Sequence, residues 1–172
     1  MKVFIKIAVF SLIVVGFYTF FAVGYIPEIT PEEPPEEKAI DVSNMGPEEF
    51  VAFGEEVYLG KGACTLCHNP MGRAPVLDDI ALKAAGRLKD PGYRGRAVDI
   101  EGYLHESMVE PSVYVVPGFG VAGTDDTVSP MPDVRGSTIG LNEVEIKAVI
   151  AYLQSIAGVE VTVAPPSEDI AQ

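Results

Sequence analysis

The sequence feature that most constrains this chain is the run Cys64-Thr65-Leu66-Cys67-His68. Two thiols at this spacing can each form a thioether with a vinyl group of a haem, and the histidine that follows can ligate the iron from one face. The chain contains no other cysteine, so neither thiol has a partner elsewhere in the sequence. The pattern predicts one covalently attached haem c, bound through Cys64 and Cys67, with His68 as an iron ligand.

Two other kinds of site could use the same residues. A thioredoxin-like redox pair would open a helix within a βαβ unit, whereas the sequence around Cys64 has the pattern of helices and loops. A zinc site would use both cysteines and one of the two histidines, but His68 is crowded against Cys67, and His105 would have to join from far along the chain. A disulfide network and a four-cysteine zinc site are excluded because the chain has only two cysteines. The haem interpretation is therefore favoured.

Residues 1–26 have the pattern of a transmembrane anchor. Lys2 and Lys6 precede an uncharged run from Ile7 to Ile26, and about 20 residues of helix span roughly 30 Å, the thickness of a hydrocarbon core. The lysines place the N-terminus in the cytoplasm by the positive-inside rule, with the rest of the chain on the periplasmic side of the inner membrane. A cleaved signal peptide is the alternative, but its apolar region is usually shorter.

Composition divides the rest of the chain into three segments. Residues 27–46 are rich in proline and glutamate, which favours an extended spacer because proline stiffens the backbone and like charges repel. Residues 47–158 are expected to form one globular domain, a normal size for a single core. Residues 159–172 are expected to form a tail. Within that tail, 159–163 alternate as a short strand would, but no partner strand is evident.

Helical periodicity and capping signals predict an all-α domain. The expected helices are one opening at Gly46-Pro47, one around 78–88, one over 99–108 that ends before Pro111, and one over 142–156 that is capped by Asn142 and followed by Gly158. The fold class predicted from sequence is thus four or so helices in the domain, preceded by one transmembrane helix.

The charge distribution bears on partners. A net charge of -13 argues against nucleic acid, because its phosphates would repel the chain. Seven basic residues nevertheless fall between positions 61 and 96, where only three acids oppose them. These side chains could form a basic rim beside the haem, or they could be solvated and face different ways.

From about Glu48 to Ala157 the chain resembles a class I cytochrome c, specifically a membrane-anchored member with a single haem. The resemblance rests on the haem motif and on the stretches 54–58, 74–77, 103–107, 111–119, 129–132 and 151–153. It implies the class I cytochrome c fold, in which helices surround one haem and the first and last helices cross closely. Gly54 and Tyr152 match the small residue and the aromatic residue at that crossing.

The resemblance also implies further site residues. Pro75 matches the proline whose carbonyl accepts a hydrogen bond from the ligand histidine and so sets its tautomer. Arg87 lies where the family often supplies a partner for a haem propionate, and Arg94 or Arg96 could do the same. The segment 119–128 is longer than the family's usual passage into the methionine loop, and it is either a partner-binding loop or a neutral insertion.

Met131 is the expected sixth ligand of the iron. Pro130 and Pro132 flank it and fix the backbone on both sides, as a rigid ligand loop requires. Met108 has the position of a packing residue on a predicted helix, and Met71 is too near the haem motif to reach the opposite face. His105 is expected at the surface of a helix.

No catalytic base, nucleophile or substrate pocket is evident, so the chain is expected to be an electron carrier and not an enzyme. A soft thioether from Met131 would favour Fe(II) and raise the potential. The expected role is one-electron transfer between respiratory or photosynthetic partners, such as a quinol-oxidising complex or a terminal oxidase, as a tethered shuttle or a complex subunit. The alternative is a haem-based sensor or small-ligand-binding haem protein, which would need an open iron position.

Overall fold

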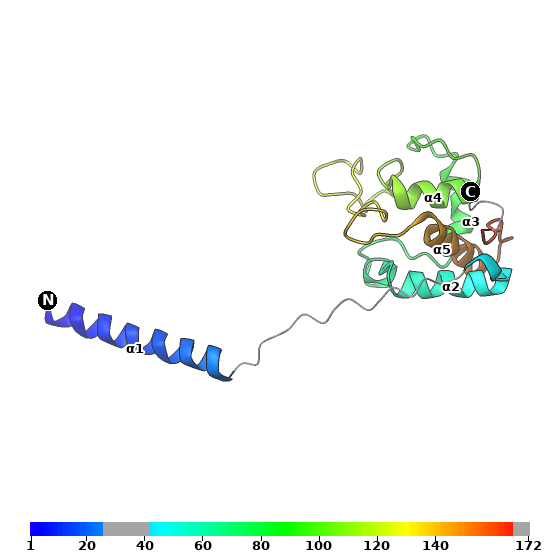
Figure 1. The fold of residues 1–172 in the computed structure, drawn as a ribbon. Helices are drawn as coiled ribbons and strands as arrows, with labels where there is room; N and C mark the ends of the chain where they lie inside the picture. Colours follow the sequence, from blue (N-terminus) through cyan, green and yellow to red (C-terminus); the bar gives the residue numbers. More distant parts are fainter. Residues whose placement is uncertain (26–41, 167–172) are drawn as a thin grey trace. The chain divides into compact units, whose positions relative to one another are not determined.

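The computed structural model describes residues 1–25 and 42–166, and all regular secondary structure in these ranges is helical (Figure 1). The chain forms two compact units, residues 1–39 and residues 40–172. The first contains helix α1, and the second contains the 3-10 helices η1 and η2 and helices α2 to α5. The expected all-α class is confirmed for the described residues. The predicted spacer lies outside them from residue 27 to 41.

Helix α1 (Lys2–Tyr25) is apolar on every side and buries none of its residues within the protein. A helix with no polar face is suited to lipid on all sides. Among the described residues it is the one helix long and apolar enough to cross a membrane, although a signal sequence near an N-terminus meets the same criteria. Aromatic side chains pair in its C-terminal half, where Phe17 contacts Tyr18 and Phe21 stacks on Tyr25.

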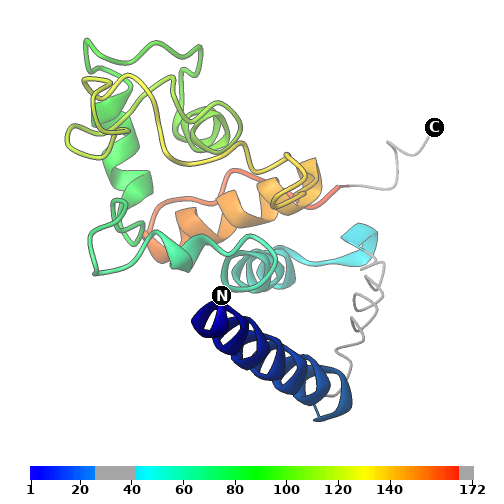
Figure 2. The same ribbon diagram turned by 90° about the vertical axis from the view of Figure 1, so that its left-hand side faces the viewer.

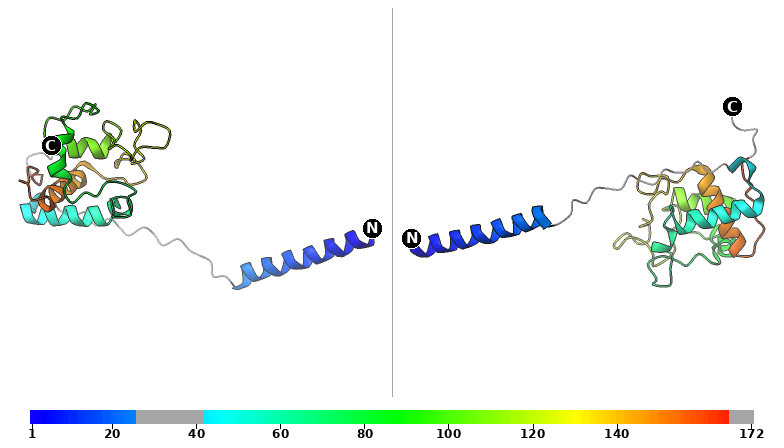
Figure 3. Two further views of the ribbon diagram at one scale, coloured as in Figure 1. Left: turned by 180° about the vertical axis from the view of Figure 1, so that it is seen from behind. Right: turned by 60° about the horizontal axis from the view of Figure 1, so that its bottom comes forward.

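Helices α2 (Pro47–Leu59) and α5 (Glu143–Ile156) form the central pair of the domain and lie against each other in every view (Figures 1, 2 and 3). Gly54 lies at the crossing, where a Cβ would overlap the backbone carbonyl of Ala148 and lie 3.0 Å from the Cβ of Tyr152. Only glycine therefore permits this approach. The ring of Tyr152 also packs on Tyr58, with centroids 5.3 Å apart.

Capping residues define where both central helices begin. The N–H of Gly46 donates to the Glu49 carboxylate at 2.8 Å, and Pro47 occupies the first turn of α2. At α5, Asn142 Oδ1 accepts from the N–H groups of Val144 and Glu145 at 2.9 and 3.0 Å. Both predicted helix starts are confirmed, because these caps satisfy N–H groups that the helices leave unpaired.

Helices α3 (Ile80–Arg87) and α4 (Ile100–Val109) complete the domain and pack against each other and against α5. Their bounds fall within two residues of those predicted. The side chain of Asp99 caps α4 by accepting from the N–H of Gly102 at 2.8 Å. The core is apolar and draws on all four helices; its most deeply buried members include Phe50, Ala81, Ala84, Tyr103, Leu104, Ile146, Val149 and Ile150.

Residues 159–166, which belong to the predicted tail, pack on the domain. Val163 is buried, and the N–H of Thr162 donates to Gln154 Oε1 at 3.0 Å. The side-chain amide of Gln154, itself buried in α5, donates back to Thr162 Oγ1 at 3.0 Å. The alternating pattern over 159–163 forms no strand; it reflects the packing of alternate valines on the core.

Candidate functional site

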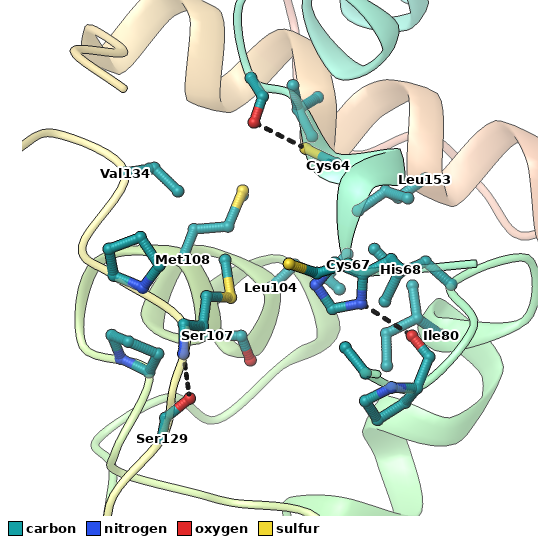
Figure 4. A pocket seen from close by; sticks show the side chains of 18 of the residues that line it. Cys64, Cys67, His68, Ile80, Leu104, Ser107, Met108, Ser129, Val134 and Leu153 are labelled. Carbon is teal, nitrogen blue, oxygen red and sulfur yellow. Dashed lines mark hydrogen bonds between the residues drawn. The ribbon is translucent and has the colours of Figure 1, made fainter. Parts of the chain in front are cut away.

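An apolar cavity of about 400 Å³ lies between the segment that follows α2 and the loop that precedes α5. Figure 4 shows its lining. All six site residues predicted from the sequence contribute to its wall: Cys64, Cys67, His68, Pro75, Arg87 and Met131. Tertiary folding therefore brings together side chains that lie up to 67 positions apart in the chain.

The two cysteines and His68 lie in and just after a short helix that follows α2. The short helix η2 (Cys64–Leu66) places the N–H of His68 on the carbonyl of Cys64 at 2.9 Å. Gly62 is required just before it, because a Cβ there would lie 2.8 Å from the carbonyl of Val57 and 3.2 Å from Cys64 Sγ. The labelled side chains of Cys67 and His68 reach into the cavity in Figure 4.

The imidazole of His68 is held in one orientation. Its Nδ1 lies 2.7 Å from the carbonyl oxygen of Pro75, and because a carbonyl can only accept, Nδ1 carries the proton. Burial lowers the pKa of His68 and outweighs the opposing effect of this hydrogen bond. The ring is therefore neutral at neutral pH, with the lone pair of Nε2 available for a ligand, which is the state a metal-binding histidine needs.

The thiol of Cys64 lies in an environment that disfavours its thiolate form. Burial raises its pKa to about 11, so it is protonated at neutral pH, whereas redox-active cysteines have a lowered pKa. Both cysteines are free. Across the described ranges, no three side chains of His, Cys, Asp or Glu gather in a way that could hold a metal ion. The geometry thus gives no support to a thioredoxin-like pair or to a zinc site.

Another part of the cavity wall is formed by the loop that contains Met131. Met131 is half-buried against the core, and its N–H donates to Ser129 Oγ at 3.1 Å. The N–H of Ser129 in turn donates to Ser112 Oγ at 3.1 Å, which ties this loop to the chain that follows α4. Pro130 and Pro132 also line the cavity, so the whole methionine loop forms its wall.

Met108, expected to be a packing residue, is buried and lines the same cavity (Figure 4). Met108 follows Leu104 by one helical turn, and this spacing in the sequence indicates that the two side chains share a face of α4. The carbonyl of Met108 accepts from the N–H of Val134 at 3.1 Å, which joins α4 to the methionine loop. Two methionines therefore reach the cavity, one from a helix and one from the loop.

The other two candidate ligands lie elsewhere. His105 does not line the cavity; its Nε2 lies 3.0 Å from the Glu143 carboxylate. Met71 is 87% exposed. Neither side chain is placed to share the cavity with His68.

Arg87 lies at a polar edge of the cavity. The sequence predicted this arginine as a site residue but not the tyrosines beside it. Its guanidinium donates to Tyr103 Oη at 3.2 Å, and both residues line the cavity with Tyr114. Tyr93, Tyr103 and Tyr114 form a cluster whose ring centroids lie 6.1 to 6.4 Å apart. Of the two alternatives to Arg87, neither lines this cavity, and Arg96 pairs with Glu110 at 3.1 Å.

Carboxylates neutralise more of the basic side chains in the segment 61–96 than its own composition indicates. Lys61 pairs with Glu145 at 2.9 Å and Lys83 with Asp79 at 2.8 Å. The partners of Lys61 and Arg96 come from outside the segment, where a count of nearby acids could not find them. Arg73 is exposed and lines the cavity, and it had not been singled out as a site residue.

Comparison of the chain with protein-family models, with curated proteins and with solved structures gave no match. A function for the chain therefore rests on the chemistry of the site, because a fold alone does not define an activity.

Proposed function

We propose that this protein is a membrane-anchored class I cytochrome c with one covalent haem, which transfers one electron at a time between redox partners on the periplasmic side. The observation that carries the proposal is the arrangement of donors around one cavity. Cys64, Cys67 and His68 lie on one wall, and Met131 lies in the loop that forms another.

The residues around the cavity fit haem c. The volume of the cavity, about 400 Å³, falls in the usual range of cofactor pockets, about 300–1,000 Å³, and the lining of the cavity is mostly apolar. Two free thiols, an imidazole with a free Nε2 and a thioether are the donors that this group requires. Arg87 supplies a guanidinium at the polar edge, suited to a propionate. When bound, haem c supplies one-electron chemistry between Fe(II) and Fe(III).

The protein's own residues account for how such a group would be held. Cys64 and Cys67 would anchor it covalently, and His68 would ligate the iron through Nε2 while Pro75 keeps its ring from turning. Met131 would supply sulfur from a loop stiffened by two prolines and by the hydroxyl of Ser129. Because the chain would supply two ligands to the iron, His68 and Met131, it would leave no open position for a small ligand, which favours electron transfer over sensing.

The close crossing of α2 and α5 supports the class I fold within this proposal. That family needs a small residue under an aromatic one at the crossing, and Gly54 and Tyr152 meet there. The helix α1 supports anchoring in the inner membrane, with redox partners such as a quinol-oxidising complex or a terminal oxidase. Lys2 and Lys6 favour a cytoplasmic N-terminus and hence a periplasmic haem domain.

The test is whether the haem is covalent. The full chain is produced with a cytochrome c maturation system, denatured, and extracted with acidified organic solvent. The colour should stay with the protein in the wild type. Cys64→Ala and Cys67→Ala should each leave one thioether and shift the pyridine haemochrome band, and the double variant should release its haem to the solvent. Release of haem from the wild-type protein would refute the proposal.

A further inference from the structure

The sequence leaves the role of the segment 119–128 open. In the structure, one carboxylate holds this segment to the chain before it. Asp126 Oδ2 accepts from the N–H of Gly118 at 2.8 Å, and Asp126 Oδ1 accepts from the N–H of Gly120 at 2.8 Å. The N–H of Val121 donates to the carbonyl of Val128 at 2.8 Å and closes the loop. These three hydrogen bonds hold the segment in one conformation, and together they are called the clamp. A neutral insertion would need none of them.

The clamp requires an unusual backbone. Asp125 and Asp126 both adopt the left-handed conformation, with φ of 49° and 55°, which aspartate tolerates better than most residues. Gly120 also approaches closely, because a Cβ there would lie 2.6 Å from the Cα of Asp126. Strained backbone of this kind persists where surrounding contacts hold it.

Phe119 lies between the two clamped glycines. Its side chain lines the same cavity as Met131, and its N–H donates to the carbonyl of Val116 at 3.0 Å. Since the N–H groups on both sides of Phe119 are bound by one carboxylate, the position of its ring depends on Asp126. The clamp ends where the methionine loop begins, at Ser129.

We propose that Asp126 is a positioning residue that holds Phe119 in the wall of the haem cavity and so keeps Met131 in place as a ligand. This inference rests on the proposed function. A carboxylate suits the role because its two oxygens can accept from two N–H groups at once, and charge strengthens both bonds. The same two bonds lower the pKa of Asp126, so the clamp is ionised at neutral pH.

The test compares Asp126→Asn with Asp125→Asn in the full-length holoprotein. Asparagine also tolerates the left-handed conformation, so the first variant removes one acceptor and the charge without adding backbone strain. Asp125 is exposed, has the same backbone conformation and loses the same charge, which makes it a matched control. Three readouts are used: hydrogen exchange of the Gly118 and Gly120 amides, the sulfur-to-iron charge-transfer band, and the affinity of the oxidised protein for imidazole.

In Asp126→Asn, the Gly118 and Gly120 amides should exchange about tenfold faster, and imidazole, which competes with Met131 for the iron, should bind about tenfold more tightly. Phe119→Leu should also tighten imidazole binding. If Asp126 acts through Phe119, the double variant should bind imidazole little better than Phe119→Leu alone, because effects through one shared residue do not add.

Three outcomes would overturn the inference. One is an imidazole affinity in Asp126→Asn that equals that of Asp125→Asn while the wild type keeps its charge-transfer band. Another is a strictly additive double variant, which would mean that Asp126 does not act through Phe119. A wild-type protein without covalent haem or the charge-transfer band would refute the proposed function as well, so the two failures can be told apart.

Discussion

Gly54→Ala should destabilise the globular domain, because the α2–α5 crossing leaves no room for a methyl group. The two nearest atoms that a Cβ would meet belong to the backbone of Ala148, so no side-chain rotation can relieve the overlap. The two helices would have to move apart and loosen the packing of Phe50 and Ile146, which are fully buried.

The magnitude follows from two opposing effects. Overpacking a well-packed core costs about 1–3 kcal/mol, and contact with backbone places this site at the upper end. Alanine favours a helix over glycine by about 1 kcal/mol, which offsets part of that cost. The net loss in the free energy of unfolding should be about 2 kcal/mol, or roughly 8 °C in Tm for a domain of this size.

The assay is urea denaturation of the globular domain, followed by circular dichroism. Gly86→Ala in α3 is the matched control, because its Cβ would meet no heavy atom within 4 Å. That variant should be slightly more stable than the wild type, by about 0.5–1 kcal/mol. If Gly54→Ala were as stable as Gly86→Ala, the close crossing of α2 and α5 would be refuted.

Two further predictions concern the ligand and the pH dependence of stability. Met131→Ala should keep the haem attached, lower the reduction potential, abolish the sulfur-to-iron charge-transfer band and admit carbon monoxide, because a soft donor to Fe(II) is lost. The control variant His105→Gln should change none of these properties. If Met108→Leu alone loses the charge-transfer band, the assignment of Met131 as the iron ligand fails. Partial burial acts to raise the pKa of Glu106, but hydrogen bonds from the hydroxyl of Tyr93 and the N–H of Arg96 outweigh it and lower that pKa below its ordinary value of 4.5. The stabilisation is therefore complete above pH 4.5 and is lost as the pH falls through the lowered value. Tyr93→Phe should cost about 1 kcal/mol at pH 7 after allowance for solvent screening and less at pH 3, measured by urea denaturation at each pH; an equal cost at both would contradict this origin.

Local chemistry let the sequence predict much of this protein. The caps at Gly46 and Asn142 join groups no more than three residues apart, so the helix starts could be predicted from neighbouring residues. The uncharged run of α1 and the spacing of Cys64, Cys67 and His68 are likewise properties of a short stretch of chain. The resemblance of several short motifs to class I cytochromes c then indicated Pro75, Arg87 and Met131, all of which line the cavity.

Only the tertiary structure decided which distant groups meet. Lys61 and Glu145 are 84 positions apart, and their pairing, which neutralises one charge of the basic segment 61–96, follows from the α2–α5 crossing. The contact between Arg87 and Tyr103 depends on how α3 packs on α4. The role of Asp126 was also hidden, because a carboxylate in a polar loop carries no sign of the amides it will bind. Helix starts and short motifs depend on a few adjacent residues, whereas these contacts depend on how separate helices and loops are packed together.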